Sequence, residues 1–305
     1  MPSSAAMDAG ALPGRPAGEP AVLAITGCSV HLPGADLPGA LDRVLPAPTS
    51  GPGSRSWAVR ASAASCPPEQ AATLLGRKGL LAKEPATRLA LCAVHRALGL
   101  AAGQRARDPL RPDTAVVACS NLGNVGTVVD IVRTVAAEGG RAVSVLAAPS
   151  ASSNIVASTV ALWFGFAGPN LMVCSGRAAG GDGLHLAGLL VRAGRARRVV
   201  LVAAEPDDPV ASALYGGPLR AGSGCVVLEP AGATATLATV APAADGVVAP
   251  SAAALGLWGD CYGALGVVDL AVAAHLVAEE GQPQVKVSFD GAPPGRRAVL
   301  VRAEA

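Results

Sequence analysis

The stretch that decides the fold runs from Gly168 to Glu205 and reads GPNLMVCSGRAAGGDGLHLAGLLVRAGRARRVVLVAAE. It begins with a short apolar strand, passes through a tight turn of small residues, continues as a helix, and ends in a second, fully apolar strand. A strand that is apolar on both faces is typical of a parallel sheet covered by helices on both sides. The stretch therefore predicts a parallel α/β fold.

The same alternation of strands and helices continues on both sides of this stretch. Helical spacing of apolar residues and short β-rich runs bounded by Gly and Pro identify the other elements. Ser152 or Ser153 is the expected cap of one helix. We expect strands from Ala21 and at 113–120, 222–230 and 234–242, helices within 84–101, 123–140, 149–165 and 266–281, and a terminal hairpin of 284–291 with 296–305.

Composition excludes several classes of function. The 305 residues are 51% hydrophobic and 15% charged, and 24 basic against 22 acidic residues give a net charge of +2 without long runs of one sign. Nucleic acid and anionic membranes are therefore not expected as partners. The longest apolar runs are too short to span a bilayer, and residues 1–20 lack the pattern of a signal peptide. We expect a disordered leader over 1–20, one domain over 21–305, and a cytoplasmic protein.

The seven cysteines show neither CxxC pairs nor histidine-rich spacing. Zinc sites and disulfide frameworks need such patterns, so we expect neither a metal nor a disulfide, and no nucleotide-binding fingerprint indicates a cofactor. Of the four histidines, His31 is expected in a loop after the first strand, and His95 and His275 on helices facing a surface or an interface.

The order and spacing of three segments resemble the β-ketoacyl synthases. These segments are GRKGLLAKEPATRLALCAVHRAL at 76–98, PSASSNIVASTVALWFGFAGPN at 149–170, and the stretch from Gly168 to Glu205. The resemblance implies a thiolase-like, five-layered α/β/α/β/α sandwich built from two related halves. Here the sandwich is expected to be shortened, with an N-terminal half over about 21–212 and a reduced C-terminal half over about 213–305.

The resemblance also implies that the family's cysteine–histidine chemistry is missing. Arg177 occupies the position of the cysteine nucleophile at the start of a helix, and Cys174 falls three residues early. No HGTGT histidine loop occurs, and Gly259-Asp260 stands where the family has its Gly-His pair. The glycine-rich Phe loop is reduced to residues 288–291. Condensing activity is therefore expected to be lost, so the chain is not expected to be an enzyme of this kind.

An arginine at a helix N-terminus is unfavourable unless an acidic group or an anion lies beside it. We therefore hypothesise an Arg177–Asp260 ion pair across the former cavity, with Asp182 as a second candidate partner. In another interpretation Arg177 holds a malonyl carboxylate or a phosphopantetheine phosphate. Cys174 or Ser175, with His185 about two helical turns beyond Arg177, remain as alternative reactive residues of an acyltransferase or hydrolase.

The leading interpretation is a noncatalytic ketosynthase-like subunit that forms a heterodimer or larger complex with an active ketosynthase in a type II polyketide (aromatic or polyene) synthase, as chain-length factors do. The resemblance implies that a strand comprising Asn170, Leu171, Met172 and Val173 pairs across the subunit interface. A basic group at a helix end either docks an acidic acyl carrier protein or serves helix-dipole and solubility chemistry. This group consists of Arg192, Arg195, Arg197 and Arg198.

Overall fold

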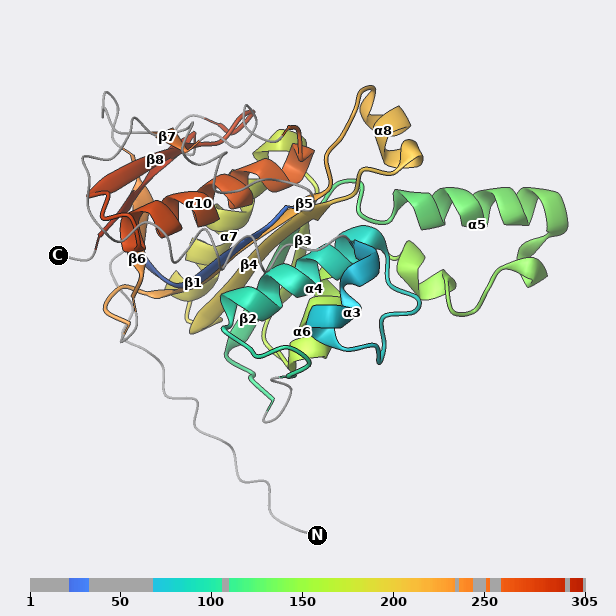
Figure 1. The fold of residues 1–305 in the computed structure, drawn as a ribbon, viewed down its shortest axis with the longest axis horizontal. Coiled ribbons are helices and arrows are strands. Elements are labelled where there is room, and N and C mark those ends of the chain that lie inside the picture. The colour runs from blue at the N-terminus through green and yellow to red at the C-terminus, as the bar shows by residue number, and fades with distance from the viewer. Residues whose placement is uncertain are drawn as a thin grey trace, which may run out of the picture.

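The computed structural model describes residues 22–32, 68–105, 110–233, 236–243, 251–252, 259–293 and 297–303 (Figure 1). The expected leader over 1–20 lies outside these residues. The described strands form one nine-stranded sheet in the order β3-β2-β4-β5-β1-β6-β9-β8-β7. Their bounds are β1 Leu23–His31, β2 Thr114–Cys119, β3 Asn170–Val173, β4 Arg198–Glu205, β5 Gly222–Pro230, β6 Ala238–Pro242, β7 Ser251–Ala252, β8 Gln284–Ser288 and β9 Ala298–Arg302.

The first five strands are neighbours in the sheet. Strands β3, β2 and β4 run parallel, and β5 and β1 continue the sheet antiparallel. β2 and β4 are apolar and almost entirely buried because helices cover both of their faces. The predicted parallel α/β core is thus present, and it ends at β3, which forms the edge of the sheet.

Helices cover both faces of the part of the sheet formed by β1 to β5. The bounds of the α-helices are α3 Ala72–Leu75, α4 Pro85–Ala97, α5 Val125–Glu138, α6 Ile155–Phe164, α7 Ala179–Arg192, α8 Pro209–Tyr215 and α10 Leu265–Ala278. α4 and α6 pack on one face, and α7 and α10 on the other. α10 also contacts β8 and β9, so it lies between the first strands and the last, and thirteen of its fourteen residues are buried.

Two helices stand apart from these layers. α5 projects from the body of the molecule, and α8 lies beside its base (Figure 1). Five short 3-10 turns complete the described elements. They are η1 Pro68–Gln70, η2 Gly140–Ala142, η3 Ala148–Ala151, η4 Gly176–Ala178 and η5 Tyr262–Ala264. No described helix is long and apolar enough to cross a membrane.

The thiolase-like α/β fold predicted from the sequence is confirmed, and the structure adds detail on its shortened form. Pairing of β1 with β6 over Leu23–Ile25 joins the first five strands to β6, β9, β8 and β7 in one sheet. Four layers can be followed: α4 with α6, the first strands, α7 with α10, and the strands β6 to β9. Within the described residues, no helix is seen to cover the outer face of that last layer. The expected boundary at 212/213 falls inside α8.

Several local expectations were wrong. α6 begins after Asn154 rather than Ser152 or Ser153, because residues 152–154 form a turn between η3 and the helix. His31 ends β1 and is fully buried rather than lying in a loop. His95 and His275 are buried rather than facing a surface, because α4 and α10 are covered on more than one side.

Candidate functional site

Arg177 lies in the turn between β3 and α7. β3 ends at Val173, and the 3-10 turn η4 carries Arg177 directly before α7 begins at Ala179. Gly176, with a φ of +66°, reverses the chain there, a conformation that residues with a Cβ rarely adopt. The side chain therefore starts from the N-terminal end of a helical segment, where unpaired N–H groups give a positive potential.

Asp260 lies opposite, directly before the turn η5. Its Oδ1 accepts a hydrogen bond from the backbone N–H of Tyr262 at 2.8 Å. Its carbonyl oxygen accepts one from the N–H of Arg220, also at 2.8 Å. Gly259 precedes it with a φ of +106°, and a Cβ there would lie 2.7 Å from Cγ of Arg220. The carboxylate is therefore held by its own backbone surroundings before any side chain approaches it.

The two residues meet in an ion pair. Nη2 of Arg177 donates to Oδ2 of Asp260 and also to the hydroxyl oxygen of Tyr215, at the end of α8. The Tyr215 hydroxyl in turn donates to Oδ2 of Asp260 at 2.5 Å. The pair hypothesised from the sequence is present, whereas Asp182 instead accepts a hydrogen bond from the Ser175 hydroxyl at 2.7 Å.

Tyr215 is a member of the site that sequence reasoning missed. Its ring lies 4.8 Å from the ring of Tyr262, measured between centroids, and 5.8 Å from Cζ of Arg177. The chain contains only two tyrosines, and both converge here. In a chain with 3% aromatic residues, a tyrosine between the strands predicted to end at Glu205 and to begin at Gly222 was the signal that could have indicated the site.

Both charged groups of the pair are held in their ionised forms. The side chains of Arg177 and Asp260 are 31% and 17% exposed. Burial is the largest influence on the pKa of Asp260 and acts to raise it, but hydrogen bonds from Tyr215, Tyr262 N and Arg177 together bring it below its ordinary value. Burial is the largest influence on the pKa of Arg177 and acts to lower it, but the hydrogen bonds and charges of Asp260 and Tyr215 together raise it above its ordinary value. The guanidinium offers no lone pair to an electrophile, and the carboxylate, with a lowered pKa and hydrogen bonds to both oxygens, is a weak base near neutral pH.

Cys174 is not poised as a nucleophile. It is exposed, and its Sγ donates to the carbonyl oxygen of Ser120 at 3.2 Å. Partial burial and the charge of Glu205 both raise the pKa of the thiol, which reduces the fraction of reactive thiolate. Cys174 thus interacts with Ser120, directly after β2, and with the charge of Glu205. His185 lies half-buried within α7.

A buried carboxyl group, Glu205 at the end of β4, supports the turn that carries Arg177. Its Oε1 accepts from Asn121 N at 2.7 Å and Asn121 Nδ2 at 3.0 Å, and its Oε2 from Leu122 N at 3.0 Å and Ser120 Oγ at 3.3 Å. Burial raises the pKa of Glu205 to about 7 against these four donors. Asn121 also binds Gly176, with Gly176 N donating to Asn121 Oδ1 at 2.8 Å. Sequence reasoning missed this cluster.

Close packing fills the space behind the ion pair. A Cβ on Gly180 of α7 would lie 2.8 Å from Cα of Gly266 in α10, so the two helix backbones touch. The ring of Phe289 packs onto this crossing, and a Cβ on Gly181 or Gly266 would lie within 3 Å of it. Phe289 is almost fully buried. The residue kept from the family's Phe loop therefore acts as a packing element between α7 and α10.

The residues expected at an interface lie on β3, at the end of α7 and at the start of β4. β3 is an edge strand, with Asn170, Leu171 and Met172 half-buried and Val173 buried. Arg198 is engaged within the chain, since it forms an ion pair with Glu229 of β5, with 2.7 Å between Nη2 and Oε1. The three other arginines of the basic group lie at or just beyond the end of α7 and are exposed; they are Arg192, Arg195 and Arg197.

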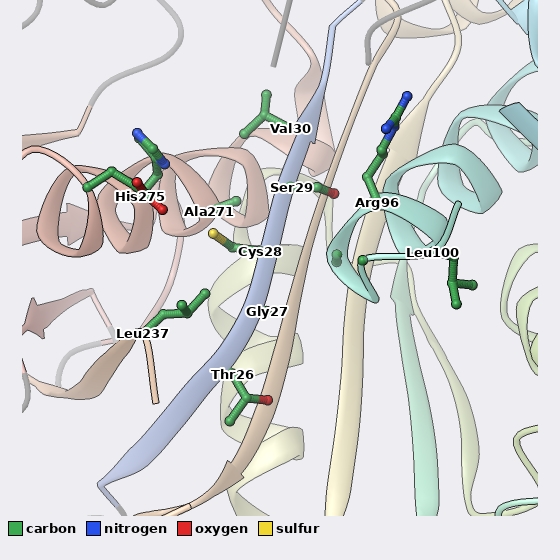
Figure 2. Close-up of a pocket in the computed structure, with 13 residues that line it drawn as sticks. Thr26, Gly27, Cys28, Ser29, Val30, Arg96, Leu100, Leu237, Ala271 and His275 are labelled. Atoms are coloured by element: carbon green, nitrogen blue, oxygen red, sulfur yellow. The ribbon is translucent and has the colours of Figure 1, made fainter. Parts of the chain in front are cut away.

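A separate cavity of about 380 Å³ lies beside β1, between the ends of α4 and α10 (Figure 2). Cys28 and His275 line it on one side of the strand and Arg96 on the other. Burial raises the pKa of Cys28 to about 12, so this thiol is unreactive. The cavity shares no lining residue with the Arg177 site. The described residues also contain no cluster of three metal-ligating side chains.

Comparisons with known proteins agree with this geometry. Residues 21–214 match the family described as beta-ketoacyl synthase, N-terminal domain. A comparison with curated proteins gave no significant match. Among solved structures, the ishigamide ketosynthase/chain length factor aligns with a TM-score of 0.66 and 20% identity, covering 94% of this chain and 100% of that one.

Two further solved structures share the fold. A complex described as AntDE:AntF, a type II PKS acyl-carrier protein with its ketosynthase bound to the hexaketide, gives a TM-score of 0.64 at 14% identity, covering 93% of this chain and 100% of that one. Ketosynthase twelve of the bacillaene polyketide synthase from Bacillus amyloliquefaciens gives 0.58 at 12% identity, covering 93% and 73%. The family match extends over well more than half of the chain. The chain belongs to the β-ketoacyl synthase family.

Proposed function

We propose that this chain is a noncatalytic ketosynthase-like subunit that pairs with an active ketosynthase in a type II polyketide synthase, as a chain-length-factor-like or stabilising subunit. The observation that carries the proposal is the Arg177–Asp260 ion pair closed by Tyr215. It lies at the start of α7, the position where the family resemblance locates the nucleophile.

The chemistry of the site supports the loss of condensing activity. Decarboxylative condensation needs a thiolate, an oxyanion hole and hydrogen-bonding or cationic histidines in one cavity. Here a guanidinium holds the first position, a carboxylate holds one histidine position, and the nearby thiol of Cys174 has a raised pKa. A cation and an anion that neutralise each other offer no nucleophile to a thioester.

The packing favours a stabilising subunit over one that measures chain length. Phe289 fills the crossing of α7 and α10, and Tyr215 closes the ion pair from the side of α8. A pocket for a growing acyl chain would need space between these same elements. The proposal therefore assigns this subunit to assembly of the complex, with the substrate cavity in its partner.

The edge strand β3 and the solved structures of similar fold support a ketosynthase as the partner. β3 leaves one side of the sheet open, and an open strand edge is suited to pairing with another sheet. Two solved structures of similar fold are described as a ketosynthase/chain length factor and as a ketosynthase with its acyl-carrier protein. Exposed Arg192, Arg195 and Arg197 offer positive charge to such a carrier, directly or alongside the ketosynthase.

A second candidate function is an acyltransferase or hydrolase that uses Cys174 or Ser175. The hydrogen bond from the Ser175 hydroxyl to Asp182 favours it, because a carboxylate within 2.7 Å can accept the proton of a hydroxyl nucleophile. Against it, burial raises the pKa of the Cys174 thiol, and the Ser175 hydroxyl donates to a carboxylate rather than to the imidazole that a triad uses.

Intact-mass measurement separates the two functions. The purified chain is mixed with malonyl- and acyl-loaded carrier protein, with an active ketosynthase as the positive control. We expect no covalent adduct and no catalysed loss of CO2 from the chain alone. An acyl adduct that disappears in Cys174→Ser or Ser175→Ala would overturn the noncatalytic function and identify the reactive residue.

Co-expression tests the partnership directly. The chain is produced together with an active ketosynthase of a type II polyketide synthase, and the complex is sized by chromatography with light scattering. We expect a stable complex of one ketosynthase with one copy of this chain. A chain that stays monomeric beside a dimeric ketosynthase contradicts the proposal.

A further inference from the structure

One side of β1 is only partly paired. On its first side β1 pairs with β5 from Leu23 to His31, whereas on its second side it pairs with β6 only from Leu23 to Ile25. Among the strands that the structure describes, none lies beside residues 26–30 on that second side. Alternate residues of a strand direct their N–H and C=O groups to each side, so this stretch offers backbone groups that no described strand uses.

The cavity of about 380 Å³ lies beside this stretch (Figure 2). Residues 26–30 line it from β1, and Leu237 lines it where β6 leaves β1. The N–H of Leu237 donates to the carbonyl oxygen of Ile25 at 2.8 Å. The register of β1 also shifts between Ile25 and Gly27, and such bulges are frequent next to functional sites. The cavity therefore occupies the position that a further strand beside β1 would take.

α4 closes the cavity on one face of β1. A Cβ on Gly27 would lie 2.3 Å from the carbonyl oxygen of Ala97, and Oγ of Ser29 donates to the carbonyl oxygen of Ala93 at 2.6 Å. The end of the helix therefore touches the strand and leaves no room for a ligand on that face. The space that remains lies along the edge of β1, next to Leu100.

α10 closes the cavity on the other face. Ala271, His275 and Glu279 line it at intervals of four residues, which places them on one face of the helix. Ala271 and His275 are 1% and 3% exposed, whereas Glu279 is exposed. Arg96, near the end of α4, is also exposed and lies across β1 from His275 in Figure 2. The cavity thus has a buried floor and charges of both signs at its mouth.

The dimensions and charges of the cavity fit a short peptide. Its volume lies within the range of about 300–1,000 Å³ that small-molecule sites have. The five residues of β1 that line it extend over about 16 Å, and an extended tripeptide spans about 10 Å. A short peptide with free termini carries an ammonium and a carboxylate at neutral pH. These two groups complement the opposite charges of Glu279 and Arg96 at the mouth.

We propose that the cavity beside β1 binds a short zwitterionic peptide, which adds to β1 as a strand where β6 leaves it. Backbone hydrogen bonds to β1 hold the peptide. The lining by Leu100, Leu237 and Ala271 favours small apolar side chains. This site shares no residue with the Arg177 site, and its function does not depend on pairing with a ketosynthase.

Titration calorimetry of the full-length chain with the tripeptide Ala-Val-Ala tests the proposal. Two matched ligands separate the contributions. Methylation of both peptide nitrogens removes the N–H donors, and acetylation with amidation removes both terminal charges. Two matched variants locate the site: Glu279→Lys reverses a charge at the mouth, and Glu69→Lys makes the same change at an exposed position that does not line the cavity.

We expect saturable one-to-one binding of Ala-Val-Ala and slower amide hydrogen exchange of residues 26–30 in its presence. The methylated peptide should bind about 10-fold more weakly or worse, because it loses hydrogen bonds to β1. The capped peptide and Glu279→Lys should each weaken binding by about 5-fold, with Glu69→Lys within about 2-fold of the wild type. Both variants should melt within about 2 °C of the wild type, because both positions are exposed.

Three outcomes would overturn the proposal. The first is the absence of saturable binding of Ala-Val-Ala. The second is equal affinity for the methylated peptide or for free valine, since neither can pair with β1 as a strand. The third is binding that Glu279→Lys leaves unchanged while exchange slows outside residues 26–30. A chain that binds the peptide as expected but forms no complex with a ketosynthase would overturn the proposed function and leave this site in place.

Discussion

Two helices of fourteen residues, α10 and α5, use their apolar residues in opposite ways. α10 is apolar on all sides, buries thirteen residues, and lies between the first and last strands of the sheet. α5 has one apolar stripe and buries none of its residues. The contrast teaches that the apolar residues beside the Arg177 site are buried within this chain, whereas those of α5 contribute little buried contact to it.

Substitution of Phe289 is the strongest test of the buried packing between α7 and α10. Phe289→Ala should lower the free energy of unfolding by about 3–5 kcal/mol, because the ring packs on both Gly181 of α7 and Gly266 of α10. Urea unfolding measures the change. A loss below about 1 kcal/mol would mean that the loop does not fill this crossing and that a substrate cavity remains possible there.

Glu205 is a buried ionisable group in the packed region, and its raised pKa makes the free energy of unfolding depend on pH. Its pKa is raised from 4.5 to about 7, so the stability it contributes is complete below pH 4.5 and is lost as the pH rises through about 7. The full shift corresponds to at most about 3 kcal/mol. Burial raises the pKa of the neighbouring thiols of Cys119 and Cys261 far above this window, so they do not contribute within it.

Thermal melts of the wild type and Glu205→Gln between pH 4.5 and 8 measure this effect. The wild type should lose stability toward neutral pH, and the variant should show a flatter profile, although it loses a hydrogen bond at every pH. Parallel profiles of the two proteins would mean that Glu205 stays ionised throughout.

Two glycines in α7 provide a matched test of the helix crossing. Gly180→Ala should cost about 1–3 kcal/mol, because its Cβ would lie 2.8 Å from the backbone of Gly266. At Gly188 the nearest atom to an added Cβ is 4.0 Å away, so Gly188→Ala should be neutral or stabilising by up to about 1 kcal/mol. Equal effects in chemical denaturation would rule out the tight crossing.

The ion pair should contribute less than the packing behind it. A double-mutant cycle with Arg177→Met and Asp260→Asn should give a coupling energy of about 1 kcal/mol, since both groups are partly exposed to solvent. The pKa of Asp260 is lowered, so its contribution is present above its unfolded pKa near 4 and is lost as the pH falls through the folded value. Coupling that persists in strongly acidic solution would contradict the ion pair.

The smallest effect on stability is expected for substitutions in the exposed helix α5. Val132→Ala should change the free energy of unfolding of the isolated chain by no more than about 0.5 kcal/mol, because the side chain is 62% exposed. Urea unfolding of the isolated chain provides the measurement. A loss of 2 kcal/mol would show that α5 packs against its own chain and would remove the contrast with α10.

The sequence by itself determined the alternation of strands and helices and the register of the Arg177 turn. Periodic apolar residues and the flanking glycines act locally, so the stretch from Gly168 to Glu205 could be interpreted without the rest of the molecule. Together with the family resemblance, the same register led to the hypothesis that Arg177 and Asp260 form an ion pair. The structure contains this ion pair.

Only the tertiary structure decided which other residues share that site and which helix faces stay exposed. Tyr215 lies 38 residues from Arg177 and 45 from Asp260, and Glu205 lies 84 residues from Asn121. Nothing local in these segments indicates such contacts, because they depend on how β2, β4, α8 and η5 pack together. For the same reason His95 and His275 proved buried, and the apolar stripe of α5, which by its pattern could equally cover a core, proved exposed.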